Sequence, residues 1–289
     1  MSRPITLLLT LVAMLAFAGN SLLCRMALAH TGIDAASFTA IRLVSGALVL
    51  WLVVQVRDRG QNKQTPLTGS WASALALFVY AGAFSYAYFS LTAATGALLL
   101  FGMVQVTMIG YGLWRGERLG LQQSIGMLFA VTGLVGLLLP GLAAPPLLGA
   151  LLMLAAGVAW GVYSLRGKAT GNAAADPTSV TAGNFLRSVP MALSLSLLAM
   201  PWMAVDRAGV LLAVASGALA SGLGYAVWYT ALRGLAATSA ATVQLSVPVI
   251  AAVGGTVFLN EAFSLRLALA SVAVLGGVAL VILKPAKPL

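Results

Sequence analysis

Residues 217–263 read GALASGLGYAVWYTALRGLAATSAATVQLSVPVIAAVGGTVFLNEAF, and this stretch decides the fold. It contains two apolar runs, each long enough for the about 20 helical residues that cross roughly 30 Å of hydrocarbon. Only Arg233 and a few small residues separate the two runs. The same order of features occurs earlier, from Tyr80 to Leu119, where an aromatic-rich run and a second apolar run are again followed by a glutamate. The sequence therefore predicts an internal duplication of membrane-spanning helices.

The composition indicates a polytopic membrane protein. Hydrophobic residues make up 61% of the chain and charged residues only 8%, whereas soluble domains carry about 25% charged residues. The net charge of +10 is spread over short loops, so membrane topology explains it better than nucleic-acid binding does. A single cysteine, Cys24, excludes an internal disulfide, and together with a single histidine it argues against a metal site. No cofactor is predicted.

Ten apolar runs predict ten membrane-spanning helices, at residues 5–29, 35–56, 71–91, 94–114, 121–139, 147–165, 178–199, 208–230, 236–259 and 266–283. The start of the first run resembles a signal peptide. However, AFAGNSLLCRMAL from Ala16 matches AWGVYSLRGKAT from Ala159, and a removed leader has no reason to recur within the chain. If the N-terminus is cytoplasmic, eleven basic residues lie on the inside and three on the outside. The positive-inside rule therefore predicts that both termini are cytoplasmic.

The duplication has a topological consequence. Residues 117–139 align with residues 261–283 at a constant offset, and the segment 139–146 contains three prolines that separate the halves 1–140 and 147–289. Because each half has an odd number of predicted helices, the second half enters the membrane in the opposite orientation to the first. We therefore expect an all-α bundle in which the halves form one transmembrane domain as a 5+5 inverted repeat. This architecture is typical of secondary transporters, which bind substrate between the repeats near the membrane midplane.

Candidate substrate-binding residues are aromatic or polar and lie deep within the apolar runs. A buried tyrosine or tryptophan needs a partner for its O–H or N–H, and a buried amide without a partner costs several kcal/mol in hydrocarbon. The same residues also fit ordinary helix packing and interhelical hydrogen bonding. Recurrence in both halves favours a site, whose candidates are Asn20, Ser21, Tyr86, Tyr88, Gln105, Trp160, Tyr163, Asn184, Tyr225, Trp228, Tyr229 and Gln244.

Three further residues are candidates for gating or for a hinge. Arg42 and Arg187 lie several residues inside the second predicted helix of their halves, and a charge within the membrane is a functional hypothesis by default. Both lie close enough to a helix end to reach the surface, so gating or structural roles are favoured, with attraction of a carboxylate as the alternative. Pro248 interrupts the ninth apolar run, where it frees a backbone carbonyl as a hinge or an acceptor.

The absence of certain groups bears on mechanism. All six acidic residues fall in predicted loops or at helix ends, whereas proton-coupled transporters usually keep a carboxylate at membrane depth. We therefore predict facilitated transport of a zwitterion with an apolar or aromatic side chain. No nucleotide-binding Gly-x-x-x-x-Gly-Lys-Ser/Thr motif occurs. An intramembrane enzyme is the alternative from another class, but His30 stands alone in a loop and no paired carboxylates lie at depth.

The duplicated sequence resembles the drug/metabolite transporter superfamily, specifically its EamA branch. The resemblance rests on the two similar halves, on GERL from Gly116 and NEAF from Asn260, on the ATSAA run at 237–241 and on Pro248. Within that branch the chain most resembles the YddG-type exporters. This resemblance implies a protein of the bacterial inner membrane that exports aromatic amino acids. Ten helices suffice for a complete pathway in one chain, so a monomer could function alone, although glycine-rich helix faces could equally serve dimers. Export of other metabolites or drugs, such as purines or toxic cations, with proton coupling, is the alternative.

Overall fold

The structure is a computed structural model that describes residues 3–62, 65–116, 118–141, 144–170, 176–232, 234–235 and 243–282. Every regular element in those ranges is helical, as the composition predicted. The helices are α1 (Arg3–His30), α2 (Ala35–Gln61), α3 (Trp71–Tyr88), α4 (Ala93–Trp114), α5 (Leu121–Leu138), α6 (Leu147–Thr170), α7 (Pro177–Leu198), η1 (Met200–Trp202), α8 (Arg207–Val214), η2 (Ala215–Leu223), α9 (Gly224–Leu232), α11 (Ser246–Leu259) and α12 (Leu265–Ile282). Glu117, Arg233 and the ATSAA run lie outside the described residues.

Polar side chains set where many of these helices begin. Asp34 lies just before α2, and its carboxylate accepts hydrogen bonds from the backbone N–H groups of Ala36 and Ser37, both at 2.9 Å. Such N-caps satisfy donors that have no partner within the helix. The other side chains that cap helices in this way are Ser70 before α3, Thr92 before α4, Asp176 before α7 and Asp206 before α8. The local sequence therefore determines where these helices begin.

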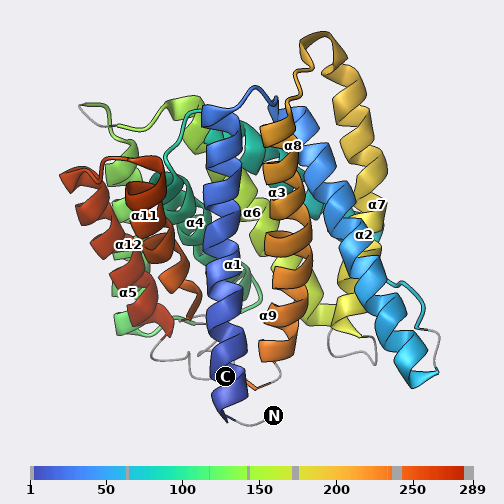
Figure 1. Cartoon of the computed structure of the whole chain (residues 1–289). Helices are drawn as coiled ribbons and strands as arrows, with labels where there is room; N and C mark the ends of the chain where they lie inside the picture. Colours follow the sequence, from blue (N-terminus) through green and yellow to red (C-terminus); the bar gives the residue numbers. More distant parts are fainter. Residues whose placement is uncertain are drawn as a thin grey trace.

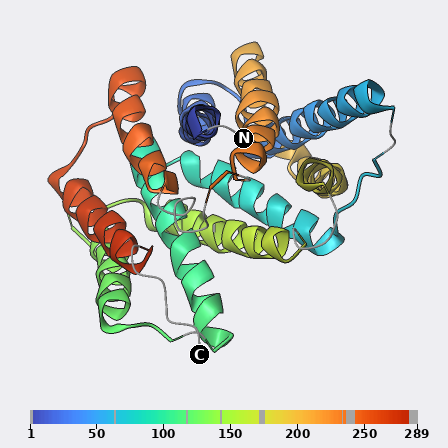
Figure 2. The ribbon, with the colours of Figure 1, turned by 90° about the horizontal axis from the view of Figure 1, so that it is seen from below.

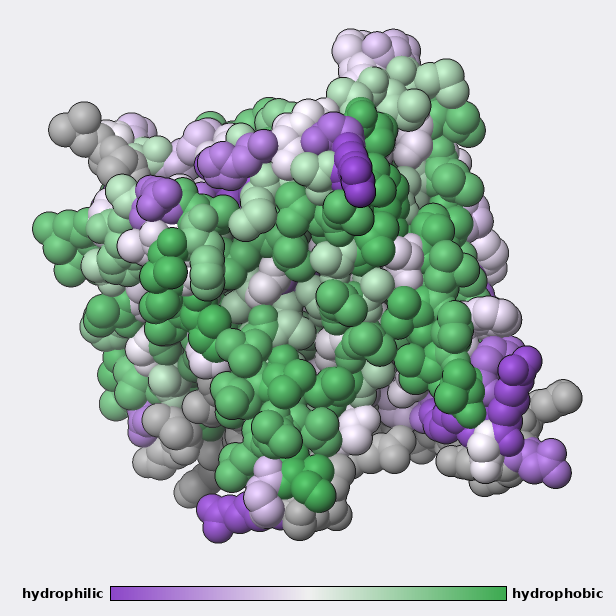
Figure 3. Space-filling view, in the orientation of Figure 1, coloured by the Kyte–Doolittle hydropathy of each residue, from purple (hydrophilic) through white to green (hydrophobic). Residues whose placement is uncertain are grey.

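The helices form a bundle with an apolar belt. Seven described segments have the length and hydropathy of membrane spans, namely α1, α2, α4, α5, α6, the continuous segment α8–η2–α9, and α12. The helix α11 is apolar but shorter, and α3 and α7 are not among the seven although they run in the same bundle (Figure 1). Green hydrophobic residues fill the middle of the face seen in Figure 3, and purple residues gather toward its upper and lower edges. The prediction of ten spans in a 5+5 inverted repeat stays a prediction.

The helices α5 and α12 pack together at one side of the bundle, as the view from below shows (Figure 2). Glycines allow the close approach: a Cβ on Gly126 would lie 2.5 Å from the carbonyl oxygen of Gly277. The amide of Gln123 also donates to the carbonyl of Val281 at 3.3 Å. The two helices that end the halves thus associate with each other and leave the remaining helices to enclose the interior.

The segment α8–η2–α9 is a continuous helix whose middle, Ala215–Leu223, is a π-helix. The sequence of that part, ASGALASGL, contains only small residues and leucine. A Cβ on Gly217 would overlap the Ser45 side chain and the backbone carbonyl of Arg42, so glycine is required where η2 meets α2. The π-helix is therefore located at a tight contact, and π-helical turns often occur at functional sites.

The structure corrects one predicted helix. One helix with Pro248 as a hinge or a source of a free carbonyl was predicted over 236–259, but in the described part a turn at Leu245 immediately precedes α11. Pro248 lies in the first turn of α11. Proline lacks an N–H, and its ring clashes with the carbonyl four residues earlier, so a helix cannot pass undisturbed through this position. The effect of Pro248 is thus to set where α11 begins.

Candidate functional site

A small enclosed cavity lies among helices from both halves of the sequence. Its volume is about 10 Å³, which is close to the minimum that holds one water molecule. Rings dominate its walls, and the residues that line it are Phe17, Asn20, Ser21, Tyr80, Phe84, Leu100, Phe101, Trp160 and Tyr225. The cavity is therefore a small aromatic pocket without room for an organic substrate.

Trp160 on α6 is the centre of the aromatic wall. Its ring centroid lies 4.8 Å from that of Tyr80 on α3, 5.1 Å from that of Tyr225 on α9 and 5.4 Å from that of Tyr163. Phe17 on α1 extends the wall, with its centroid 5.8 Å from that of Tyr225. Contacting rings at these distances attract one another beyond simple area burial. Four helices thus contribute to one continuous aromatic surface, which suits a flat, apolar group.

Asn20 is the amide within this aromatic surface. Its Oδ1 accepts a hydrogen bond from the Ser216 hydroxyl on η2 at 2.6 Å, and its Nδ2 donates to the Tyr80 hydroxyl at 3.4 Å. The site therefore places an amide donor beside a phenol in a largely aromatic cavity that Ser21 also lines. Such a combination can orient a polar group of a ligand while the rings contact its apolar part.

A second polar pair lies on the far side of Trp160. The Asn184 amide on α7 donates to the Tyr163 hydroxyl at 3.5 Å, and its oxygen accepts the backbone N–H of Ser70 at 2.9 Å. Asn184 thus fixes the start of α3 against α7. Both of its polar atoms have partners, and Asn184 does not line the aromatic cavity.

Arg42 on α2 is buried, contrary to the expectation that it could reach the surface. Its side chain is 1% exposed. Its Nε donates to the Ser221 hydroxyl at 3.3 Å and one terminal N–H donates to the Tyr80 hydroxyl at 3.0 Å. The position of Arg42 along α2 gives only its distance from the membrane surface. The side chain does not extend toward that surface, because it lies on the face of α2 that points into the bundle. Arg42 therefore sits directly behind the cavity wall.

Arg187 on α7 has different surroundings. One of its terminal nitrogens donates to the backbone carbonyls of Thr68 at 3.0 Å and Gly183 at 2.9 Å. The side chain is half-buried. Arg187 therefore ties α7 to the segment that leads into α3, away from the cavity.

The structure brings together only part of the predicted site. Asn20, Ser21, Trp160 and Tyr225 line the cavity, whereas Tyr86 is 40% exposed on the outside of α3. Seven other predicted residues do not line the cavity. Of these, Tyr163, Trp228 and Tyr88 contact rings of its wall. The remaining four are Gln105, Asn184, Tyr229 and Gln244.

Three rings of the site on α1 and α3 were not predicted, namely Phe17, Tyr80 and Phe84. Two signals were available for them. Tyr80, Phe84 and Tyr88 are four residues apart and so share one helix face, and their rings contact in order at 5.4 and 4.8 Å. Phe17 aligns with Trp160 in the internal match of the two halves. Leu100 and Phe101 complete the lining without any such signal.

An ion pair closes the bundle at the end where α1 meets α2. Arg25 Nε donates to Glu261 Oε1 at 2.8 Å, and one of its terminal nitrogens donates to the backbone carbonyl of Tyr88 at 2.9 Å. The other Glu261 oxygen accepts the backbone N–H of Ala93 at 2.7 Å. Helix α1, the turn between α3 and α4, and the end of α11 are thus held together by one charge-assisted network.

A second ion pair joins the halves at the opposite end of α2. Arg57 donates to the Asp176 carboxylate at 2.7 Å, and the backbone N–H of Ser179 donates to the same oxygen at 2.9 Å. Partial burial raises the pKa of Asp176, but the hydrogen bonds from Arg57 and Ser179 outweigh burial and lower the pKa below its ordinary value. Asp176 therefore stays ionised at neutral pH.

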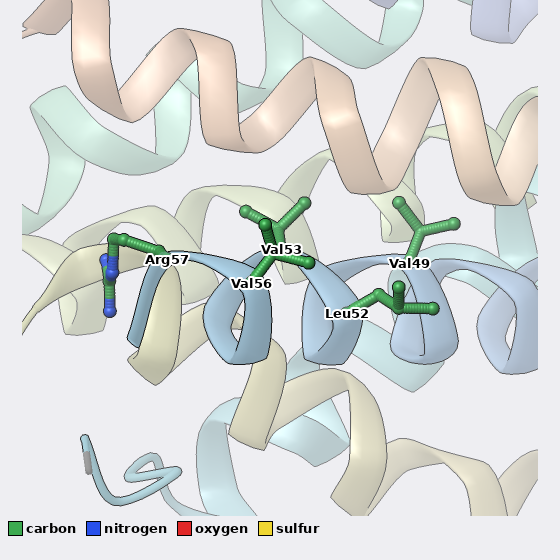
Figure 4. A pocket seen from close by; sticks show the side chains of 5 residues that line it. All are labelled: Val49, Leu52, Val53, Val56 and Arg57. Carbon is green, nitrogen blue, oxygen red and sulfur yellow. The ribbon is translucent and has the colours of Figure 1, made fainter. Parts of the chain in front are cut away.

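The larger hollows lie on the surface. Figure 4 shows Val49, Leu52, Val53 and Val56 on α2, with Arg57 next along the same helix. These apolar side chains line an open groove of about 450 Å³. A polar hollow lies beside it where α2 leads into α3, lined among others by Asp58. Of these three hollows, the small aromatic cavity is the one lined by helices of both halves.

An apolar helical bundle with an enclosed aromatic and polar site defines a membrane transporter of small molecules. The chain belongs to the EamA-like transporter family, which matches residues 4–139 and 147–283. It is 59% identical over 277 residues to the Pseudomonas aeruginosa protein named "Uncharacterized protein PA1977", covering 96% of this chain and 94% of that one. It is also similar to a solved crystal structure with a TM-score of 0.68 and 21% sequence identity, covering 98% of this chain and 99% of the other. That likeness concerns the fold.

Proposed function

We propose that this chain is a secondary transporter that exports aromatic amino acids. The observation that carries the proposal is the wall of rings around Trp160, which is contributed by four helices and interrupted by the amide of Asn20. Rings of Phe, Tyr or Trp would stack between these side chains, and polar groups of the substrate would replace hydrogen bonds now made within the protein. Other apolar amino acids would be weaker substrates.

The proposed mechanism is alternating access. The cavity of about 10 Å³ is too small for an amino acid, so substrate can bind only after helices move apart. Networks at both ends of the bundle, Arg25 with Glu261 and Arg57 with Asp176, connect the two halves of the sequence. In our proposal the halves are inverted five-helix repeats within ten spans, and they open one network while the other stays closed.

We propose that transport is facilitated and not coupled to protons. Each described acidic residue lies in a connection or close to a helix end, and none lines the cavity. Without a carboxylate at membrane depth, the described part of the site has no ordinary proton carrier. Substrate would then move down its own gradient. We place the protein in the bacterial inner membrane as a monomer, with both termini in the cytoplasm.

Reconstitution in liposomes tests the function. Labelled phenylalanine and tryptophan should exchange much faster than alanine, and an imposed proton gradient should not drive their accumulation. The Trp160→Ala variant removes the central ring and should slow exchange of the aromatic substrates at least about tenfold, if stacking against the ring contributes about 1.5 kcal/mol. Trp160→Phe, which retains a ring, should retain most of the activity and would show that the site still folds.

Trp114→Ala provides the matched control, because Trp114 is 79% exposed at the end of α4. This variant should exchange aromatic amino acids at the wild-type rate. The proposal is wrong if alanine exchanges as fast as phenylalanine, or if Trp160→Ala and Trp114→Ala behave alike. Accumulation of substrate driven by a proton gradient would overturn the facilitated mechanism alone.

A further inference from the structure

Arg42 is a buried cation with unused hydrogen-bonding capacity. Its guanidinium carbon lies 4.8 Å from the centroid of the Phe84 ring and 5.2 Å from that of Tyr80. Ser221 and Tyr80 accept two of its N–H groups, but the terminal nitrogen NH1 has no hydrogen-bond partner. A buried donor without an acceptor costs free energy, and the cost is larger when the donor is charged.

No described carboxylate neutralises Arg42. The groups that face it from the surrounding helices are the thiol of Cys24 on α1, the rings of Tyr80 and Phe84 on α3, the hydroxyl of Ser221 on η2 and the phenol of Tyr225 on α9. The ion pairs on Arg25 and Arg57 lie elsewhere. Arginine cannot lose its proton in a protein. Arg42 therefore carries a positive charge that contacts two aromatic rings but that no described carboxylate compensates.

We propose that Arg42 binds the carboxylate of the transported substrate, and that the site selects aromatic carboxylates whether or not they carry an ammonium group. This inference rests on the proposed function, because it takes the aromatic cavity as the transport site. The ammonium group has no comparable partner, since no described carboxylate lines the cavity. Net anionic aromatic acids are therefore substrates, and aromatic cations are excluded.

The Tyr80 hydroxyl shows where the carboxylate would bind. It accepts a hydrogen bond from Arg42 at 3.0 Å and another from the Asn20 amide at 3.4 Å, and Tyr80 itself lines the cavity. The Tyr80 hydroxyl oxygen thus accepts hydrogen bonds from both the Arg42 guanidinium and the Asn20 amide. When the helices part and Tyr80 turns aside, a carboxylate would bring two oxygens to the same donors and engage NH1 as well. Guanidinium and carboxylate groups match in this two-point geometry.

Trp160 lies beside this position, with its ring centroid 4.8 Å from that of Tyr80. A carboxylate held by Arg42 would therefore place the rest of the ligand against the aromatic wall. Arg42 supplies the charge selection and the rings supply the shape selection. These are separate contributions and can be tested separately.

Binding of four probes to the purified full chain, measured by isothermal titration calorimetry, tests the inference. The probes are 3-phenylpropionate, its uncharged amide, phenylalanine and butyrate. Wild-type protein should bind 3-phenylpropionate about tenfold to a hundredfold more tightly than the amide, as expected for charge-assisted hydrogen bonds. Phenylalanine should show no advantage over 3-phenylpropionate. In Arg42→Gln the preference for carboxylate over amide should disappear, with the affinity for the amide little changed.

Two variants complete the test. Arg42→Lys retains the charge and should retain part of the preference, whereas Arg187→Gln removes an arginine that already bonds backbone carbonyls and should retain all of it. Equal binding of carboxylate and amide by wild-type protein, no binding of any carboxylate, or a preference that persists in Arg42→Gln would overturn the inference. If butyrate binds as tightly as 3-phenylpropionate and Arg42→Gln weakens both, the aromatic function fails while the anion site stands.

Discussion

Arg42 and Arg187 occupy similar places in the sequence, yet the structure gives them opposite surroundings. Each lies several residues inside the second helix of its half. Arg42 is 1% exposed and contacts hydroxyls and aromatic rings. Arg187 is half-buried and donates to two backbone carbonyls. Two arginines at similar positions in predicted membrane helices can thus differ in whether their N–H groups find acceptors within the protein.

An arginine that donates to backbone carbonyls has fixed partners and supports the fold. An arginine behind a cavity, with one nitrogen unpartnered, costs stability until a ligand supplies an acceptor. Proteins retain such costly groups at functional sites, where activity and stability are in conflict. We therefore expect substitutions of Arg42 to affect transport more than stability, and substitutions of Arg187 to do the reverse.

The largest expected effect is on transport by Arg42→Gln. This change removes the charge but keeps a polar side chain, and it should lower the initial rate of phenylalanine exchange in liposomes by about tenfold to a hundredfold. Arg187→Gln, measured at the same protein density, should stay close to the wild-type rate. Equal losses in the two variants would show that the arginines are alike in function and would remove the contrast between them.

The next effect concerns the packing that holds Arg42 in place. In Gly217→Ala the added methyl group would overlap the Ser45 side chain and the Arg42 carbonyl, so η2 must shift away from α2. We expect a loss of about 1–3 kcal/mol in stability, as for other overpacked contacts, together with slower transport. Thermal unfolding in detergent measures the first quantity.

Gly136→Ala is the matched control, because nothing lies within 4 Å of a Cβ at that position on α5. Alanine favours helix over glycine by about 1 kcal/mol at a helix interior, so this variant should be neutral or slightly stabilised. A Gly217→Ala variant as stable as Gly136→Ala would show that η2 and α2 are not in the close contact described.

A smaller effect separates the two arginines in stability. Arg187→Met removes the side-chain hydrogen bonds to the carbonyls of Thr68 and Gly183 and should cost about 1–2 kcal/mol. Arg42→Met removes a buried charge, which stabilises the folded state, and removes the cation–π contacts of that charge, which destabilises it. These two contributions to the free energy of unfolding should cancel to within about 1 kcal/mol. Urea or thermal unfolding of both variants checks the order, and a larger loss for Arg42→Met would contradict it.

Much of the fold could be predicted from the sequence because its signals are local. Apolar runs predicted where helices lie, and capping residues such as Asp34 and Asp176 mark where they begin. The break before α11 was missed because Pro248 was read as a bend inside a longer helix. The π-helix could not be predicted, since it depends on how closely Gly217 approaches α2, which is a tertiary contact.

The site was predictable only in part, for a related reason. Trp160 and Tyr225 stood out because a buried polar ring needs a partner. Phe17 needs none, so nothing in its chemistry distinguishes a cavity wall from ordinary core. Arg42 was expected to reach the surface at least as readily as to stay inside. The sequence gives the distance of a residue from the end of its helix but does not show which helix face turns inward. Helical spacing from Tyr80 would have recovered the missed face of α3.

The smallest expected effect concerns Arg57, an arginine that the protein itself neutralises. Burial raises the pKa of Asp176, but hydrogen bonds from Arg57 and Ser179 lower it overall. A carboxylate whose pKa is lowered by folding stabilises the folded state above its ordinary pKa, and this contribution is lost as the pH falls through the lowered value. Asp176→Asn keeps a good helix cap but loses the charge.

At pH 7 this variant should therefore be at most about 1 kcal/mol less stable than the wild type, as is usual for a partly exposed ion pair. The difference should disappear when the pH falls below the lowered pKa of Asp176, because the wild-type carboxylate is then neutral too. Unfolding curves of both proteins between pH 7 and about pH 1 measure the difference, because the contribution of a carboxylate with a lowered pKa is lost progressively over about that range. A difference in stability that persists at the lowest pH would mean that Asp176 stabilises the protein through the shape of its side chain and not through its charge. The ion pair of Arg57 would then stabilise the fold no more than the bonds of Arg187 to backbone carbonyls do.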